Sequence, residues 1–164
     1  MYNEILATLL PVEKPLLADR IEKINKSLRP GIEDLRWNSQ NIDPFIKEAM
    51  LIVSDVDDLV RKMKDNVKKM QEMMQKWEKP LFDRKLKPCL PDDVEQTHAS
   101  LVGPRLEDIK SHGREIHKLM KDTAENIKPD KKSLTWHSYV NYVNCLVIEG
   151  ITNGINSSMS FMAD

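Results

Sequence analysis

Apolar residues recur along residues 42–77 at alternating steps of three and four, the spacing of a heptad repeat. This spacing holds one face of a helix against its neighbours. Asp43 can cap the helix start with Pro44 in the first helical position, and Pro80 disfavours helical geometry at Lys79. The sequence therefore predicts one long helix, and the two core positions of its repeat are filled by Ile46, Val53, Val60, Val67 and Met74, and by Ile42, Ala49, Val56, Met63, Met70 and Trp77.

A second apolar row lies beside this seam, which makes the apolar stripe wider than a two-stranded coiled coil needs. The long helix is therefore expected to face at least two partner helices. The methionines of the seam are flexible fillers, so they either simply fill a core or leave the pairing adaptable. The second row consists of Phe45, Ile52, Leu59 and Met73.

Further helices are predicted on both sides of the long one. Residues 2–10 form a short helix, and residues 17–35 form either one kinked helix at Pro30 or two abutting helices. Residues 94–127 predict a helix with a kink at Pro104. A last helix is expected to be capped by Ser133, with an apolar row made of Trp136, Val140, Val143, Val147, Ile151, Ile155 and Met162.

The composition supports a helical fold in a single domain. The 164 residues include only 5 glycines and 5% aromatic residues, against 31% charged residues, a balance that favours helix over sheet. A chain of this length has enough apolar material for one core. We expect an all-α fold over residues 1–164: an elongated antiparallel helical bundle built around one long central helix.

Charge is spread unevenly along the chain. The formal net charge is -1, which argues against a general nucleic-acid binder. Residues 61–87 nevertheless carry ten Lys or Arg against four Asp or Glu, whereas both flanks are negative. This basic stretch is either a solvated helix face neutralised by its neighbours or a surface for a polyanion, in which case salt would weaken the binding.

The two cysteines, Cys89 and Cys145, come without a secretory leader or an apolar run that could cross a bilayer. This usage is typical of a reduced intracellular compartment, and we expect no membrane partner.

No constellation for catalysis is expected. His112 and His117 are five residues apart, so on a helix they point about 140° from each other, unlike the four-residue spacing of zinc-binding helices. Cys145 stands in an apolar stretch, where a small buried hydrophobe is the ordinary outcome and a nucleophile the rare one. The glycines stand apart from one another, so no phosphate-binding loop can form. We therefore predict no catalytic, cofactor-binding or metal-binding residues.

Five residues are candidates for packing or docking. Trp37, Trp77 and Trp136 are the large anchors. Trp77 and Trp136 fall on predicted apolar faces and are expected in the core, whereas Trp37, just before a polar turn, is either a core plug or a docking hot spot. Gly150 and Gly154 lie four residues apart on the last predicted helix. They let another backbone approach closely, either within the chain or between chains.

Three stretches of the sequence resemble the tail of axonemal dynein heavy chains. The first contains a leucine-x-tryptophan-x-serine element, here Leu35, Trp37 and Ser39, and is followed by the long helix. The similarity continues in consistent order over most of residues 3–162. The three stretches are residues 28–39 (LRPGIEDLRWNS), 113–119 (GREIHKL) and 136–150.

The resemblance implies a non-catalytic segment of the tail of a microtubule motor, whose ATPase ring lies elsewhere in the heavy chain. It implies other dynein heavy chains and the intermediate and light chains as partners, indirect contact with the doublet microtubule, and a place in the cytoplasm and cytoskeleton, in the axoneme of a cilium or flagellum. The alternative is a spectrin-like cytoskeletal crosslinking or adaptor module, which would contain three helices of similar length.

Overall fold

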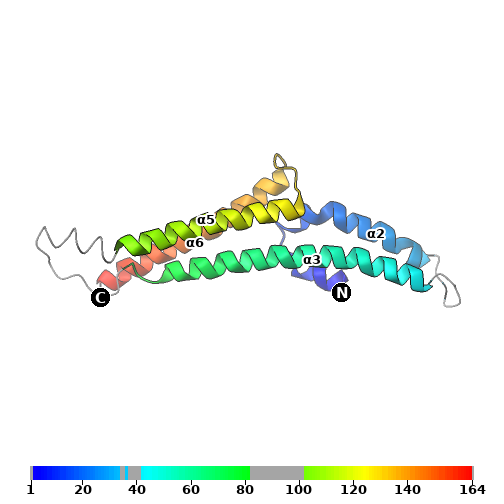
Figure 1. Cartoon of the computed structure of the whole chain (residues 1–164), viewed down its shortest axis with the longest axis horizontal. Helices are drawn as coiled ribbons and strands as arrows, with labels where there is room; N and C mark the ends of the chain where they lie inside the picture. Colours follow the sequence, from blue (N-terminus) through cyan, green and yellow to red (C-terminus); the bar gives the residue numbers. More distant parts are fainter. Residues whose placement is uncertain (1, 34–35, 37–41, 82–101, 164) are drawn as a thin grey trace, which may run out of the picture. The chain divides into compact units, whose positions relative to one another are not determined.

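The computed structural model describes residues 2–33, 36, 42–81 and 102–163, and these residues form helices and no strand (Figure 1). The predicted all-α class is confirmed. Five α-helices are described, and they are α1 Tyr2–Thr8, α2 Ala18–Glu33, α3 Ile42–Gln75, α5 Gly103–Ile127 and α6 Leu134–Ala163.

The long predicted helix is present as α3, followed by a 3-10 turn, η2, over Lys76–Glu78. Lys79 is extended (φ -68°, ψ 140°), as expected of a residue before proline. The helix begins at Ile42, one residue before the predicted cap at Asp43. That α3 is the single centre of the bundle stays a prediction.

The other predicted helices are present with adjusted bounds. Residues 18–33 form one helix that continues past Pro30. Pro104 is the second residue of α5, a first-turn position where its missing N–H would have no partner in the helix. The predicted start of this helix at Val94 lies outside the described residues. Ser133 caps α6 as predicted, because its Oγ accepts a hydrogen bond from the Trp136 backbone N–H at 3.2 Å.

The chain divides into two compact units, and both take parts of α3, α5 and α6. Unit 1 comprises residues 1–65 and 123–140, and unit 2 comprises residues 66–122 and 141–164.

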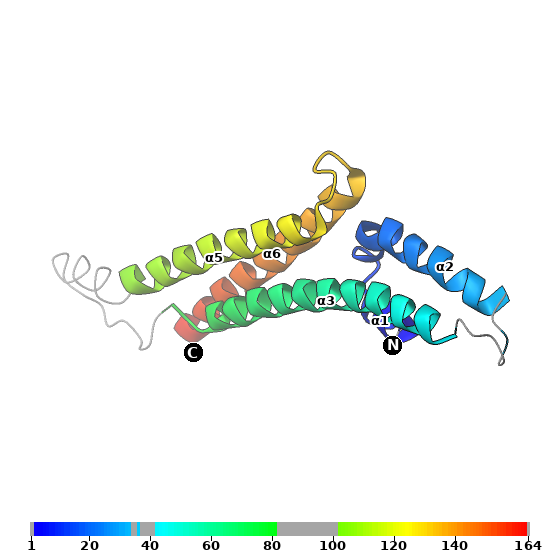
Figure 2. The ribbon, with the colours of Figure 1, turned by 45° about the vertical axis from the view of Figure 1, so that its right-hand side comes forward.

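Unit 1 is built on α2 and the first part of α3, which lie side by side (Figure 2). The two helices run in opposite directions, because Gly31 of α2 lies against the ring of Phe45 and Glu13, just before α2, pairs with Lys64. The buried hydrophobic side chains that unit 1 contributes are Ile5, Leu9, Leu17, Ile24, Val53, Val56, Leu59, Val60, Met63, Ile127 and Tyr139.

Burial along α3 follows the heptad seam from Val53 onward but not before it. The eight seam residues from Val53 to Trp77 are all buried, whereas Ile46 is 45% exposed and Ile42 and Ala49 are half-buried. The first two turns of α3 therefore lack the cover that the repeat predicts.

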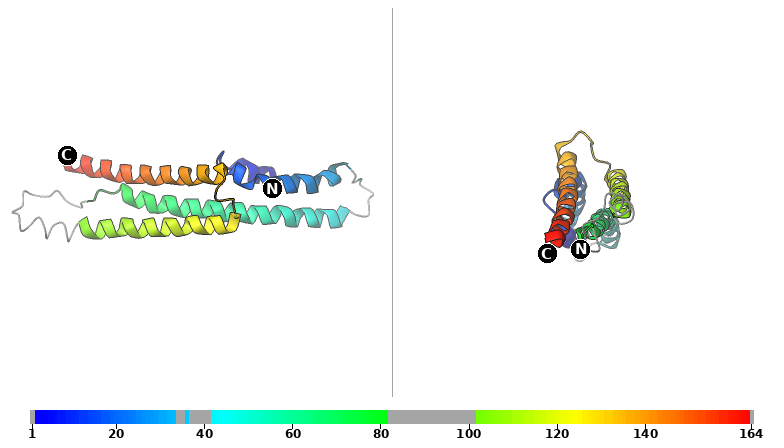
Figure 3. Two further views of the ribbon diagram at one scale, coloured as in Figure 1. Left: turned by 90° about the horizontal axis from the view of Figure 1, so that it is seen from above. Right: turned by 90° about the vertical axis from the view of Figure 1, so that its left-hand side faces the viewer.

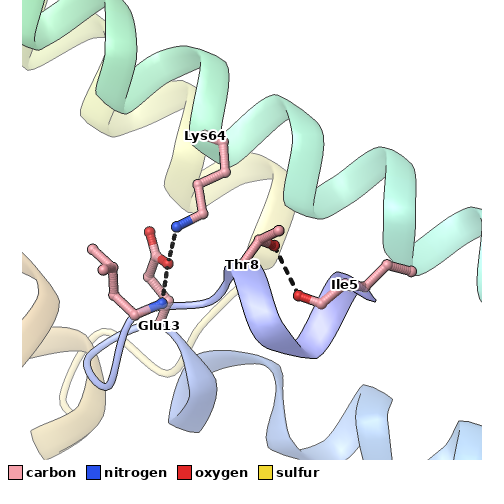
Figure 4. A network of polar contacts seen from close by, with 5 residues as sticks. Ile5, Thr8, Glu13 and Lys64 are labelled. Atoms are coloured by element: carbon pink, nitrogen blue, oxygen red, sulfur yellow. Dashed lines mark hydrogen bonds and ion pairs between the residues drawn. The ribbon is translucent and has the colours of Figure 1, made fainter. Parts of the chain in front are cut away.

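A buried carboxylate ties the segment before α2 to α3 within unit 1 (Figure 4). The Glu13 side chain is fully buried. Its Oε2 accepts hydrogen bonds from the Leu10 backbone N–H at 2.7 Å and from Lys64 Nζ at 2.5 Å. The Lys64 side chain is 31% exposed and brings the neutralising charge. A charge taken out of water is costly unless it is paired, so Lys64 makes the burial of Glu13 possible.

Replacing Lys64 by methionine is expected to lower the free energy of unfolding by about 1 to 2 kcal/mol, because the Glu13 carboxylate stays buried without a counter-charge. Urea unfolding at neutral pH measures this. The matched control is Arg61→Met, which removes the pair of Arg61 with Asp58, both more than half exposed, and which is expected to change stability by less than about 0.5 kcal/mol. Equal effects of the two substitutions would contradict this account of Glu13.

Unit 2 contains the end of α3 with α5 and α6 (Figure 3). Residue 66 of α3 and residue 77 of the following turn η2 contact residues 119 and 112 of α5, so α3 and α5 are antiparallel. Residues 74 and 77 lie against residues 150 and 154 of α6, so α3 and α6 run in the same direction. The buried hydrophobic side chains that unit 2 contributes are Val67, Met70, Met74, Trp77, Ile116, Leu119 and Val143.

The predicted apolar row of α6 coincides with the packed face only in the first half of the helix. Val143 is 2% exposed, but Ile151 and Ile155 are 42% and 50% exposed, so the prediction that these two isoleucines mark the packed face is wrong. In this later part of α6 the buried positions are the small residues Gly150, Gly154 and Ser158. Small residues lie there because the end of α3 comes close to the α6 backbone.

Candidate packing site at the end of α3

The end of α3 in unit 2 is held by side chains from both α5 and α6. At its centre is Trp77, which is 3% exposed. Its indole Nε1–H donates a hydrogen bond to His112 Nδ1 at 3.0 Å, and the two rings are tilted by 34° with centroids 6.3 Å apart. An indole N–H can only donate, so His112 Nδ1 is the acceptor of this hydrogen bond.

Arg105 of α5 caps the carbonyl end of this segment. Its guanidinium donates hydrogen bonds to the backbone oxygens of Lys76 at 3.1 Å and Lys79 at 3.3 Å. The last carbonyls of a helix lack intrahelical donors and carry partial negative charge. The guanidinium therefore satisfies oxygens that would otherwise depend on water.

Two glycines of α6 make room for Trp77. A side chain at Gly154 would collide with the backbone oxygen of Trp77, and a Cβ at Gly150 would lie 3.0 Å from Met74 Cβ and 3.3 Å from Trp77 Cε3. The backbone of α3 thus comes closer to α6 than any residue larger than glycine permits at position 154.

Ser158 continues this row of small residues by one turn. Its Oγ donates to the Gly154 backbone oxygen at 2.7 Å and accepts from the Leu81 backbone N–H at 3.0 Å. Leu81 lies just past the end of α3, where no helical partner is left for its N–H. The site therefore joins three chain segments through one indole, one guanidinium, one hydroxyl and two glycines.

The sequence candidates are only partly brought together. Trp77, Gly150 and Gly154 meet in one site. Trp136 is half-buried in unit 1, with its ring 5.7 Å from that of Tyr139, and Trp37 lies outside the described residues. Residues 82–87 of the basic stretch are outside them as well.

The sequence reasoning missed three residues of the site. Ser158 could have been found, because it follows Gly150 and Gly154 at the same four-residue spacing. His112 was considered only as a metal ligand, and its pairing with Trp77 depends on the register between α3 and α5. Arg105 gives no signal in the sequence that distinguishes it from other surface arginines.

A groove of about 660 Å³ lies in unit 1, among the start of α2, the middle of α3 and the turn before α6. Its lining contains three acidic and three basic residues and neither histidine nor cysteine, so it resembles a solvated junction more than a reaction site. The charged residues are Asp19, Asp55, Asp130, Arg20, Lys23 and Lys128.

The described ranges contain neither a metal-binding cluster nor a membrane-spanning helix. Across residues 2–33, 36, 42–81 and 102–163, no three His, Cys, Asp or Glu side chains are grouped to hold a metal ion. In the same part of the chain, no helix combines the length and apolar character needed to span a bilayer.

Comparison with known proteins points to one family. The sequence model of "Dynein heavy chain, N-terminal region 1" matches residues 1–45. The chain is 35% identical over 164 residues to the dynein beta chain of the flagellar outer arm of Chlamydomonas reinhardtii, and 32% identical over 167 residues to the ciliary dynein beta chain of Heliocidaris crassispina. It is 30% identical over 169 residues to dynein axonemal heavy chain 9 of Homo sapiens.

Each of these alignments covers 99% of this chain and 4% of the relative. The described residues form an all-α protein, and the site at the end of α3 holds helices together. The chain belongs to the axonemal dynein heavy chain family and corresponds to part of the N-terminal region of those heavy chains. The resemblance noted in the sequence is confirmed.

Proposed function

We propose that residues 1–164 form one helical-bundle segment of an axonemal dynein tail, which serves as a scaffold and carries out no catalysis. In this role the segment helps to assemble the heavy chain with other heavy chains and with the intermediate and light chains. Through them it contributes to attachment to the doublet microtubule in a cilium or flagellum. The observation that carries the proposal is the similarity to axonemal heavy chains over 99% of the chain.

The geometry supports a mechanical role. The buried seam of α3 runs without interruption from Val53 to Trp77, and Trp77 and Arg105 fix its end to α5. A helix held along its length and at its end resists bending better than an isolated one, because its packed side chains cannot rearrange independently. The segment is therefore suited to hold bound subunits in a fixed arrangement.

The spectrin-like alternative fits the helices less well. A spectrin-type module would have three helices of similar length, whereas the described helices contain 7, 16, 34, 25 and 30 residues. Nothing in the described residues favours that alternative.

The proposal is tested by mixing the 164-residue chain with purified intermediate and light chains of a flagellar outer arm. We expect at least one of them to co-elute with the chain in size-exclusion chromatography, and we expect no saturable binding in an ATP titration. The Gly113→Ala variant is the control, and we expect it to bind the same subunits as the unchanged chain, because nothing lies within 4 Å of a Cβ at Gly113. The proposal fails if every subunit elutes separately or if ATP binds saturably.

A further inference from the structure

A row of exposed apolar side chains lies on α6 in unit 2, away from its packed face. We call it the α6 stripe, and it consists of Ile148, Ile151, Ile155 and Met159, which are 63%, 42%, 50% and 66% exposed. The residues follow one another at steps of three, four and four. At about 100° per residue they fall within an arc of about 80°.

The α6 stripe is distinct from the contact with α3. Gly150, Gly154 and Ser158 face the end of α3, and the mean directions of this row and of the stripe differ by about 105° around the helix, with Ser158 next to the edge of the stripe. The α6 helix thus has two faces of low polarity, and the described residues cover only one of them. Exposed contiguous apolar patches mark interaction surfaces more often than scattered single residues do.

The part of α6 that carries the stripe has almost no charged residues of its own. Between residues 141 and 163, Glu149 is the only charged residue. Thr152, which lies between Ile151 and Ile155 in the sequence, donates its hydroxyl hydrogen to the Ile148 backbone oxygen at 2.8 Å. Its hydroxyl hydrogen therefore needs no hydrogen-bond acceptor on a neighbouring helix. This chemistry fits an apolar partner and not a nucleic acid or an acidic surface.

The form of the stripe suits a helix as the partner. Side chains at steps of three and four along α6 make ridges that fit the grooves of a second helix. The partner must present apolar side chains at the same spacing and no charge toward the stripe. A charge placed there would lose its water without gaining a counter-charge.

The size of the stripe indicates where this helix comes from. Four side chains offer on the order of a few hundred Å², against about 800 Å² per partner in a stable complex of separate proteins. A helix on the same polypeptide needs less area, because the connection gives it an effective concentration in the millimolar range. The chain spans only 4% of the length of its relatives, so such a polypeptide has many further segments.

We propose that the α6 stripe is the docking surface for an uncharged face of an amphipathic helix from the same heavy chain, outside residues 1–164. This inference rests on the proposed function, since it requires that the chain is a segment of a heavy-chain tail. The inference adds to that function which kind of helix lies against the segment, and that the contacting face of this helix is uncharged.

Cysteine labelling tests the proposal in the chain alone and in the full heavy chain. Ile151→Cys reports on the stripe, and Ser160→Cys is the matched control, because Ser160 is exposed on the same helix but lies outside the stripe. Cys145, which is exposed and not buried as its apolar neighbours in the sequence predict, lies one turn before Ile148 and is replaced by serine in both. Maleimide labelling at residue 151 is expected to be at least about tenfold slower in the full heavy chain, with residue 160 little changed.

A photo-crosslinking amino acid at position 155 of the full heavy chain identifies the occupant. We expect crosslinks to a peptide of the same heavy chain outside residues 1–164. Equal labelling rates at residue 151, or crosslinks to a second copy of the chain, would overturn the inference. Crosslinks to an intermediate or light chain would overturn it too, yet would support the scaffold role. Failure of the scaffold role shows separately, as loss of subunit binding in the mixing experiment.

Discussion

Replacing Trp77 by alanine is expected to lower the free energy of unfolding by about 3 to 5 kcal/mol, the largest effect of any single substitution considered for this chain. The indole is 3% exposed and lies among Met74, Gly150 and Gly154. Its loss opens a cavity that the α6 backbone cannot fill with side chains of its own. Urea or thermal unfolding followed by circular dichroism at 222 nm measures the change.

Two related substitutions separate the contributions of Trp77. Trp77→Phe keeps an aromatic ring but removes the donor to His112 Nδ1, and it is expected to cost about 1 to 2 kcal/mol. Trp136→Ala is expected to cost less than Trp77→Ala, because the Trp136 side chain is only half-buried. If Trp136→Ala proved the more damaging, the assignment of Trp77 as the anchor of unit 2 would be wrong.

Replacing Gly154 by leucine is expected to lower the free energy of unfolding by about 2 to 3 kcal/mol, although leucine favours helix more than glycine does. A side chain at this position meets the backbone oxygen of Trp77, which belongs to the main chain and cannot rotate away. Helix α6 would have to move away from the end of α3, and the bond between Ser158 and Leu81 would weaken with it.

The matched control for Gly154 is Gly113→Ala on α5. A Cβ at Gly113 meets nothing within 4 Å, so only the helix preference remains, and we expect a gain of about 0.5 to 1 kcal/mol. Opposite signs at the two glycines would show that close packing, and not helix preference, sets the requirement at position 154. A gain in stability at both would contradict the geometry described for the site.

The fold could be predicted where hydrophobic spacing decides the structure. The seam of α3 is such a case, because large apolar residues at heptad spacing leave few other ways to bury them, and all seam residues from Val53 to Trp77 are buried. The cap at Ser133 is another, since it depends only on neighbouring residues. The exposed Ile46 shows that a heptad repeat predicts which face of a helix is apolar, but not how far along the helix other segments pack against that face.

The packed face of α6 could not be predicted from hydrophobicity. The isoleucines of α6 suggest one face, yet the contact with α3 uses Gly150, Gly154 and Ser158, because the approach of two backbones selects for small volume. The meeting of Trp77 with these residues depends on the register between helices that are more than 70 residues apart in sequence. No local sequence pattern encodes that register, so the contacts of the site could not be predicted from the sequence.

The most direct test of the scaffold role is subunit binding by a full heavy chain that carries Gly154→Leu. We expect the intermediate and light chains to co-purify with it much less than with the heavy chain carrying Gly113→Ala, while the microtubule-stimulated ATPase activity of the motor stays the same. Undiminished co-purification would contradict the account, provided that circular dichroism shows the 164-residue chain to be destabilised by Gly154→Leu.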